Sequence, residues 1–219
     1  MDPLKPQDAP GGRVPIRSLG ERNRRRIAGH LLALDEEDRY LRFGYAATDE
    51  QIQRYVDGLD FVHDDIFGIF NRKLELIAMA HLAFLPHEAN APAGAEFGVS
   101  VLKKARGRGY GSLLFHRAVM HARNEGVELM FIHALSENTA MIRIARNGGA
   151  TLERAGSETE AYLRLPPATL DSRVSEMLEE QVALADYRLK RQAKNFLDFL
   201  ANLQQIRRGA ANARSRSGR

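Results

Sequence analysis

Arg106-Gly107-Arg108-Gly109-Tyr110-Gly111 stands between an apolar, strand-like run at residues 96–102 and a long helical pattern that begins at Tyr110. A strand, a glycine-rich turn and a helix N-terminus together make an anion site. The backbone N–H groups of the first helical turn are free there, and the helix dipole favours negative charge. Gly109 and Gly111 carry no side chain that would keep a phosphate away from these N–H groups. The segment therefore predicts a ligand that carries a pyrophosphate.

The spacing of the glycines distinguishes between the known pyrophosphate-binding turns. A Walker loop requires Gly-x-x-x-x-Gly-Lys followed by Ser or Thr, and the chain contains no Lys-Ser or Lys-Thr pair. A Rossmann turn requires Gly-x-Gly-x-x-Gly, whereas the spacing here is Gly-x-Gly-x-Gly. The remaining match is Arg-x-x-Gly-x-Gly, which resembles the acyl-CoA signature of the GNAT N-acetyltransferase superfamily. Taken alone, these six residues are more typical of an ordinary turn between a strand and a helix.

The surroundings of this signature also resemble that superfamily. A strand pattern, Glu96 to Leu102, precedes the signature, and an amphipathic helix pattern, Tyr110 to Asn124, follows it and stops at Gly126. After a further predicted strand, Glu128 to Leu135, residues 138–149 look like the family's second motif, an Asn followed by a short helix. Two motifs in this order and at this spacing favour the resemblance over coincidence.

The flanking patterns complete an α/β (α+β) domain. They predict a first strand at Val14–Leu19 and a helix at Glu21–Leu34, and the capping box Thr48-Asp49-Glu50-Gln51 predicts the start of a second helix. Two further strands are predicted at Ile66–Phe70 and Leu74–Leu85, and a closing hairpin at Ala150–Gly156 and Ala161–Leu165. Arg39-Tyr40-Leu41-Arg42-Phe43 resembles a segment of some bacterial GNAT proteins, part of which acetylate protein lysines. The resemblance covers roughly residues 14–165. It implies the GNAT fold, a central mixed, mostly antiparallel sheet flanked by helices.

The two ends of the chain differ from this domain. Residues 1–13 read as a disordered lead, and residues 209–219 as a basic, disordered tail. Residues 168–208 predict a long amphipathic helix or helix pair with a heptad seam at Leu178, Val182, Ala185, Leu189, Gln192, Phe196, Phe199 and Leu203. One continuous helix from Leu170 to Arg208 would reach roughly 57 Å, too long to pack wholly on a small domain. We therefore expect a homodimer through this extension, with a helix hairpin or a helix wrapped on its own core as the alternative.

Composition excludes several classes of protein. The chain has 219 residues, of which 44% are hydrophobic, a net charge of +4 and no Cys, so disulfides, thiolate metal sites and Cys nucleophiles are ruled out. We expect no metal site. No apolar run reaches the length of a membrane span, and residues 1–12 lack a signal-peptide core, so we expect no membrane partner and a cytoplasmic protein. The basic tail is not interleaved with aromatic residues, which makes nucleic acid an unlikely partner.

The resemblance implies an acetyl-CoA-dependent N-acetyltransferase that moves an acetyl group from the thioester directly to an amine. In the family the fourth strand diverges from the fifth, and its backbone N–H groups bind the pantetheine arm and the thioester oxygen. That role falls here to Val99, Ser100 and Val101. The pyrophosphate would be bound by Arg106, Gly107, Arg108, Gly109, Tyr110, Gly111 and Ser112, and the pantetheine arm also by Asn138.

For the general base we select Glu96. It lies near the start of the cofactor strand, where the family often places a carboxylate that takes the amine proton directly or through water. Neighbouring apolar residues predict that Glu96 is partly buried, which would raise its pKa. His81, which alternates with apolar residues on a strand, is the rival base, and His133 is a weaker one. The alternative interpretation of either histidine is an ordinary core or surface residue without a catalytic role.

The sequence departs from the family pattern at one catalytic position. Many members carry a Tyr on the short helix of the second motif as the acid for the leaving thiolate, and Ala145 stands here instead. Ser136 or solvent could replace that acid, since a thiol pKa near 8.5 makes solvent adequate. A non-catalytic acyl-CoA-binding module that signals through its C-terminal helix is the alternative function. The acceptor is a protein lysine or a small amine, and loops at residues 39–48 and 86–95 are expected to bind it.

Overall fold

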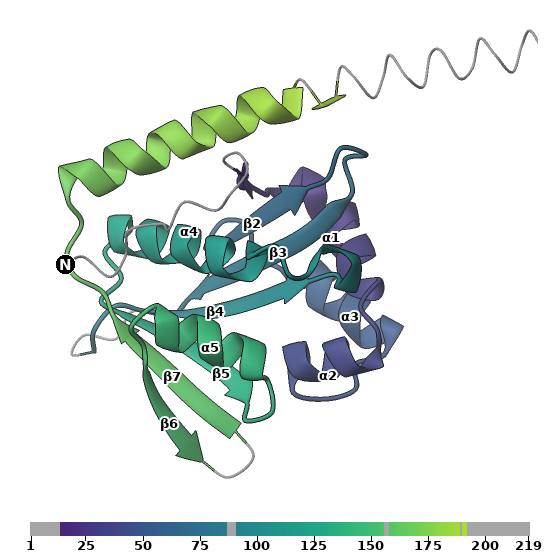
Figure 1. Ribbon diagram of the computed structural model, residues 1–219, viewed down its shortest axis with the longest axis horizontal. Helices are drawn as coiled ribbons and strands as arrows, with labels where there is room; N and C mark the ends of the chain where they lie inside the picture. Colours follow the sequence, from purple (N-terminus) through teal and green to yellow (C-terminus); the bar gives the residue numbers. More distant parts are fainter. Residues whose placement is uncertain (1–13, 87–90, 156–157, 189, 192–219) are drawn as a thin grey trace, which may run out of the picture.

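A computed structural model describes residues 14–86, 91–155, 158–188 and 190–191 (Figure 1). These residues form one seven-stranded sheet in the order β1-β2-β3-β4-β5-β7-β6. The strands are β1 (Arg17–Ser18), β2 (Asp64–Phe70), β3 (Leu76–Phe84), β4 (Gly94–Val101), β5 (Leu129–Leu135), β6 (Thr151–Ala155) and β7 (Glu158–Arg164). Neighbouring strands are antiparallel except β4 and β5, which are parallel. The predicted mixed, mostly antiparallel sheet is therefore confirmed.

Helices cover both faces of this sheet (Figure 1). They are α1 (Arg24–Leu32), α2 (Glu36–Phe43), α3 (Asp49–Asp57), α4 (Tyr110–Asn124) and α5 (Thr139–Asn147), with short 3-10 turns at Glu21–Asn23 and Lys103–Ala105. Each face has its own apolar core. Phe97 and Phe115 pack edge to face beneath α4, and Ile27, Leu31 and Ile52 fill the space under α1 and α3. Because strand side chains alternate between faces, β2 and β3 supply residues to both cores.

Local chemistry explains where the helices begin and end. The predicted capping box at Thr48 is present, with reciprocal hydrogen bonds between Thr48 and Gln51. Part of the expected loop at residues 39–48 is instead the end of α2. Asp35 caps the start of this helix by accepting the Asp38 N–H at 3.0 Å, and Gly44 ends it in the left-handed region at φ +80°. The loop is thus shorter than expected and begins at Gly44.

The C-terminal extension is helical over residues 170–188 and at 190–191. The face that packs on the domain is largely polar. Glu176 and Glu180 pair with buried Arg117 of α4 at 2.9 and 3.0 Å, and Tyr187 stacks on the guanidinium of Arg17, 3.6 Å from the ring centroid. Alongside them, Ala183 is fully buried. Charge pairing and stacking, more than apolar contact, therefore hold this helix on the domain.

The predicted heptad seam lies on the opposite, outer face of this helix. The side chains of Leu178 and Val182 are 56% and 43% exposed, and Ala185 is exposed as well. Leu170, Val174 and Met177 extend the same apolar strip toward the start of the helix. The seam positions from Leu189 onward, like residues 1–13 and 209–219, lie outside the described residues. Among the helices that the structure describes, none is both long and apolar enough to cross a membrane.

Candidate active site

The site begins where β4 and β5 separate. The two strands pair over Gly94 to Glu96, the last pair being Glu96 with Phe131, while β5 continues to Leu135 beside β7. Leu102 donates its backbone N–H to Ile77 on the β3 side. Because backbone groups alternate along a strand, the N–H groups of Val99 and Val101 point away from β3, into the gap that β5 leaves. These two groups are free to bind a ligand.

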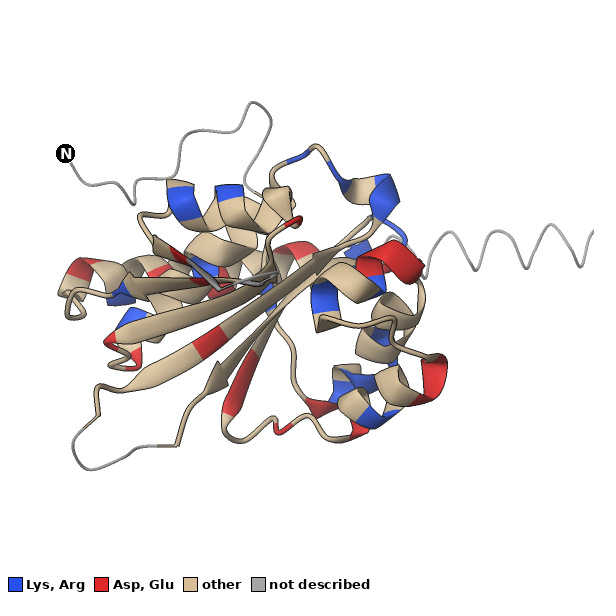
Figure 2. Cartoon of the chain, turned by 90° about the horizontal axis from the view of Figure 1, so that it is seen from below, with Lys and Arg blue, Asp and Glu red and all other residues tan. Residues whose placement is uncertain are grey.

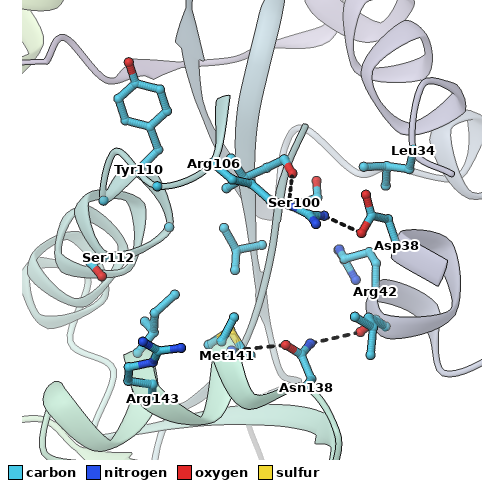
Figure 3. A pocket seen from close by; sticks show the side chains of 18 of the residues that line it. Leu34, Asp38, Arg42, Ser100, Arg106, Tyr110, Ser112, Asn138, Met141 and Arg143 are labelled. Atoms are coloured by element: carbon cyan, nitrogen blue, oxygen red, sulfur yellow. Dashed lines mark hydrogen bonds and ion pairs between the residues drawn. The ribbon is translucent and has the colours of Figure 1, made fainter. Parts of the chain in front are cut away.

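A cavity of about 420 Å³ occupies this gap (Figure 3). That volume lies within the usual range for small-molecule sites. Its wall is built by β4, the glycine-rich turn, and helices α2, α4 and α5. Most of the predicted cofactor residues line it: Val99, Ser100, Val101, Arg106, Gly107, Gly109, Tyr110, Gly111, Ser112 and Asn138. Of the predicted site residues, Glu96 and Arg108 do not line the cavity.

The glycine turn has the geometry that the sequence requires. Gly107 and Gly109 adopt φ +75° and +74°, the left-handed region in which a side chain is strained. The first bond of α4 runs from the Leu113 N–H to the Gly109 carbonyl, so the N–H groups of residues 110–112 have no partner within the helix. A Cβ on Gly111 would lie 2.9 Å from Cδ1 of Ile144. The turn therefore presents three N–H groups to the cavity and packs α4 tightly against α5.

Arg106 is held at the cavity wall by a partner that the sequence reading missed. Its guanidinium pairs with Asp38 of α2, and its Nε donates to the Val101 carbonyl at 3.2 Å. The Asp38 side chain is only 5% exposed, whereas that of Arg106 is 46% exposed. The buried carboxylate fixes the direction of the arginine and leaves part of the guanidinium available to a phosphate. The two residues are 68 positions apart, so no local pattern links them.

Ser100 and Asn138 line the cavity with polar groups that are already bonded to protein. The Ser100 hydroxyl lies 2.8 Å from Nε2 of His30, whose Nδ1 lies 2.9 Å from the Leu76 carbonyl. Burial lowers the pKa of His30 to about 4, so the ring is neutral, with Nδ1–H donating to the carbonyl and Nε2 accepting from the hydroxyl. Asn138 accepts the Met141 N–H at 3.1 Å and donates to the Leu41 carbonyl at 3.3 Å. Its observed role is to cap α5 and tie it to α2.

Three titratable side chains meet on the opposite side of β4, on the face covered by α1 and α3. Strands β2 to β5 carry few charged residues (Figure 2). Strand register nevertheless places Asp64, His81 and Glu96 on one face of β2, β3 and β4, with both carboxylates diagonal to the imidazole. His81 donates from Nε2 to Asp64 at 2.9 Å, and Nδ1 accepts the Tyr55 hydroxyl at 2.7 Å. Burial lowers the pKa of His81 in spite of the Asp64 charge.

The remaining predicted candidates are placed less favourably. Glu96 is exposed, so the expectation of partial burial was wrong. Its position at the fork leaves its carboxylate open to solvent. His133 is 54% exposed, and its Nδ1 lies 3.9 Å from Glu160, away from the cavity lining. Ala145 is buried, and Ser136 bonds Thr159 at 3.0 Å, also outside the lining.

Comparisons with known proteins agree with this geometry. Residues 29–148 match the profile of the acetyltransferase (GNAT) family. The GNAT domain of S. lividans PAT superposes with a TM-score of 0.61 at 22% identity, covering 72% of this chain and 93% of that one. RimL, a ribosomal L7/L12 α-N-protein acetyltransferase in complex with coenzyme A, gives 0.53 at 18% identity over 72% and 97% of the two chains. Salmonella typhimurium yncA with acetyl-CoA gives 0.55 at 16%, also over 72% and 97%. At these low sequence identities, the structural similarity shows a shared fold and no more than that.

Proposed function

The chain belongs to the GNAT acetyltransferase family and is an acyltransferase, and on that premise we propose that it moves the acetyl group of acetyl-CoA directly to an amine. The observation that carries the proposal is the fork between β4 and β5, with the cavity and the glycine turn at its base. Coenzyme A and acetyl-CoA in the RimL and yncA structures support the choice of co-substrate. We assign the catalytic domain to residues 14–165.

The residues present fit acetyl-CoA. The free N–H groups of residues 110–112 and the guanidinium of Arg106 would bind the pyrophosphate, because both provide positive potential at one end of the cavity. Gly107, Gly109 and Ser112 would complete that end, and Arg108 would approach it from solvent. The N–H groups of Val99 and Val101 would bind the pantetheine arm and the thioester oxygen, with Asn138 along the arm.

Glu96 would act as the general base. Its carboxylate sits at the fork, on the sheet face that also carries His81 of β3 and Asp64 of β2, and this acidic surface would attract a protonated amine. When the carboxylate takes a proton, the amine nitrogen can attack the thioester carbon. The C–N bond forms, the C–S bond breaks, and the sulfur keeps the electron pair and takes a proton from solvent. A solvent acid is adequate because thiol pKa values lie near 8.5.

The acceptor that we propose is a protein lysine, with a small amine as the other candidate. The segment at residues 39–43 supports lysine through its resemblance to bacterial lysine-acetylating proteins. Transfer of radiolabel from acetyl-CoA to lysine peptides and to small amines tests the proposal. Label in either acceptor class supports it. Tight acetyl-CoA binding without transfer to any amine would favour the alternative, a non-catalytic acyl-CoA-binding module. That alternative is considered because Ala145 stands in place of the usual Tyr.

We also propose that residues 168–208 join two copies of the chain, and that the protein is cytoplasmic. The outer strip of Val174, Leu178, Val182 and Ala185 is apolar and exposed. Its sequence period continues through Phe196, Phe199 and Leu203. Acidic residues dominate the first half of the extension and basic residues the second half, so an antiparallel pair of copies places opposite charges side by side. A second copy of this chain is therefore the occupant that matches the strip.

A further inference from the structure

Arg42 of α2 reaches into the cavity from the side opposite the glycine turn (Figure 3). Its guanidinium lies flat against Gly98 of β4, because a Cβ built on that glycine would lie 2.7 Å from Nη2, 2.8 Å from Cζ and 3.0 Å from Nη1. Gly98 directly precedes Val99, whose N–H points into the fork. The guanidinium therefore stands next to the position at which the thioester oxygen would be bound.

The charge of Arg42 is not neutralised by a carboxylate. Arg106, another cation that lines the cavity, pairs with Asp38. Within the described part of the chain no carboxylate lies at ion-pair distance from Arg42, and its hydrogen bond runs from Nη2 to the Tyr55 hydroxyl at 3.2 Å. Arg42 also lowers the pKa of both His30 and His81, although it is the smaller cause beside burial. A cation of this kind in a cavity wall is suited to meet negative charge on a ligand.

A chain of side chains from three elements fixes the direction of this guanidinium. Asp64 accepts from His81, His81 accepts from Tyr55, and Tyr55 accepts from Arg42. The Tyr55 ring packs edge to face on Phe43 at 5.4 Å between centroids. Tyr55 and His81 each bond the next side chain on both sides, so the Tyr55 hydroxyl is held in place to accept from Nη2 of Arg42. Tyr55, His81 and Asp64 are thus positioning residues for Arg42.

We propose that Arg42 stabilises the negative charge that develops on the thioester oxygen during acetyl transfer, an inference that rests on the proposed function. As the amine nitrogen attacks, the carbonyl π electrons move to the oxygen, which then carries a full negative charge. The Val99 N–H and the Arg42 guanidinium donate to it together. When the C=O bond re-forms, the C–S bond breaks and the electron pair leaves with sulfur. Arg42 undergoes no net change in this step.

Steady-state kinetics of Arg42→Met, Arg42→Lys and Gly98→Ala test the proposal, with the exposed Arg54→Met on α3 as control. Loss of one oxyanion donor lowers kcat by about 10²–10³-fold, so we expect that loss in Arg42→Met, an intermediate loss in Arg42→Lys, and a KM for acetyl-CoA within about twofold of wild type. Gly98→Ala should displace the guanidinium and lower kcat, but should add nothing in the Arg42→Met background, because the two changes remove one interaction. Guanidinium ion should partly restore an Arg42→Ala variant.

A binding measurement separates this inference from the proposed function. S-carboxymethyl-CoA places a carboxylate close to the thioester oxygen, and S-isobutyl-CoA has the same branched shape without charge. Arg42→Met should weaken the first ligand by about tenfold or more and leave the second within about twofold. Equal affinity changes for both ligands, or an unchanged kcat in a folded Arg42→Met protein, would overturn the role of Arg42. Failure of wild type to acetylate any amine would overturn the proposed function instead, whatever the ligand affinities.

Discussion

Glu96 and Phe131 form the last residue pair at which β4 and β5 run side by side. Beyond this pair β5 follows β7, while β4 remains with β3, so the two parallel strands open into the cavity. The carboxylate of Glu96 therefore stands at the apex of the fork, and the free N–H of Val99 follows three residues later. On the proposed function, the general base and one oxyanion donor would therefore lie on one strand.

Glu96→Gln should lower kcat by about 100-fold or more, because the amide retains the size of the side chain but cannot take a proton. The KM for acetyl-CoA should change little, since Glu96 does not line the cavity. Initial rates with a saturating amine, measured across pH, check the result. Glu125→Gln, at an exposed position after α4, is the control and should keep wild-type rates.

The same rate measurements distinguish Glu96 from His81 as the general base. If Glu96→Gln keeps its rate while His81→Asn loses it, His81 is the base, and its lowered pKa would place the acidic limb of the profile below pH 6.5. If both variants lose activity, the shape of the profile decides. A base variant removes the acidic limb, whereas a variant that only misplaces Arg42 lowers the rate at every pH.

Gly109→Glu should abolish acetyl-CoA binding, with an affinity loss on the order of 100-fold or more. The residue occupies the left-handed region at φ +74°, and a carboxylate there would oppose the pyrophosphate beside the first turn of α4. Titration calorimetry with acetyl-CoA measures the loss. Gly29→Glu makes the same change at an exposed position inside α1, where nothing lies within 4 Å of the new Cβ, and should bind normally. Unchanged binding by Gly109→Glu would remove the glycine turn from the site.

The sequence predicted the elements that depend on local pattern. The limits of α4 match the prediction of Tyr110 to Asn124, and the capping box at Thr48 starts α3 as expected. Local signals of this kind, a left-handed glycine or a cap, act within one turn of chain. The same applies to the end of the cavity that the glycine turn lines, because the motif itself forms that turn.

The residues that the sequence reading missed are those whose partners are distant. Asp38 meets Arg106 across 68 residues, and Tyr55 meets His81 across 26. The C-terminal extension shows the same limitation. Its apolar period predicted a seam, and the described part of that strip is exposed, whereas the face that packs on the domain is polar because Glu180 pairs with buried Arg117 63 residues away. Only the fold brings such pairs together, so hydropathy alone could not indicate which side of the helix would be covered.

The free energy of unfolding should fall between about pH 6.5 and pH 9. Burial would lower the pKa of His121, but hydrogen bonds and charge from Asp65 and Glu176 outweigh it and raise that pKa to about 9. A group whose folded-state pKa is raised contributes stability below its unfolded value of about 6.5 and loses it as pH rises through the folded value. Since the side chain of Asp65 is 40% exposed, screening limits the loss to the order of 1 kcal/mol.

Urea unfolding at several pH values measures this dependence, with His121→Gln as the matched variant. The variant should be less stable near pH 6 and should show a flatter curve up to pH 9. The charged groups that face His121 are Asp65 from β2, Glu176 from the C-terminal helix and Arg117 from α4 itself. Burial would raise the pKa of Glu176, but its hydrogen bonds to His121 and Asn124 outweigh burial and lower that pKa. The Glu176 carboxylate therefore stays ionised between pH 6.5 and pH 9. Equal slopes for wild type and variant would contradict the assignment.

The last prediction concerns the outer face of the C-terminal helix. If two copies pair through it, Val174→Asp/Leu178→Asp should raise the dimer dissociation constant by about 100-fold or more, because both side chains are more than half exposed in one chain and would be buried in the pair. Sedimentation equilibrium measures the constant, and circular dichroism confirms that the helix persists. Ser175→Asp adds one negative charge to the side of the strip, against two in the double variant, and should leave the dimer intact.

Cysteine crosslinking then decides the direction of pairing, because the natural chain contains no Cys and a single introduced thiol is unique. In an antiparallel pair only residues near the centre of the seam approach their own copies. Ala185, midway between Leu170 and Leu203, meets that condition, whereas Val174 does not. Oxidation should therefore crosslink Ala185→Cys and leave Val174→Cys monomeric on denaturing gels. Crosslinking of both variants would indicate parallel helices and would overturn the charge argument. A wild type that sediments as a monomer at about 100 μM would remove the second copy as the occupant of this face.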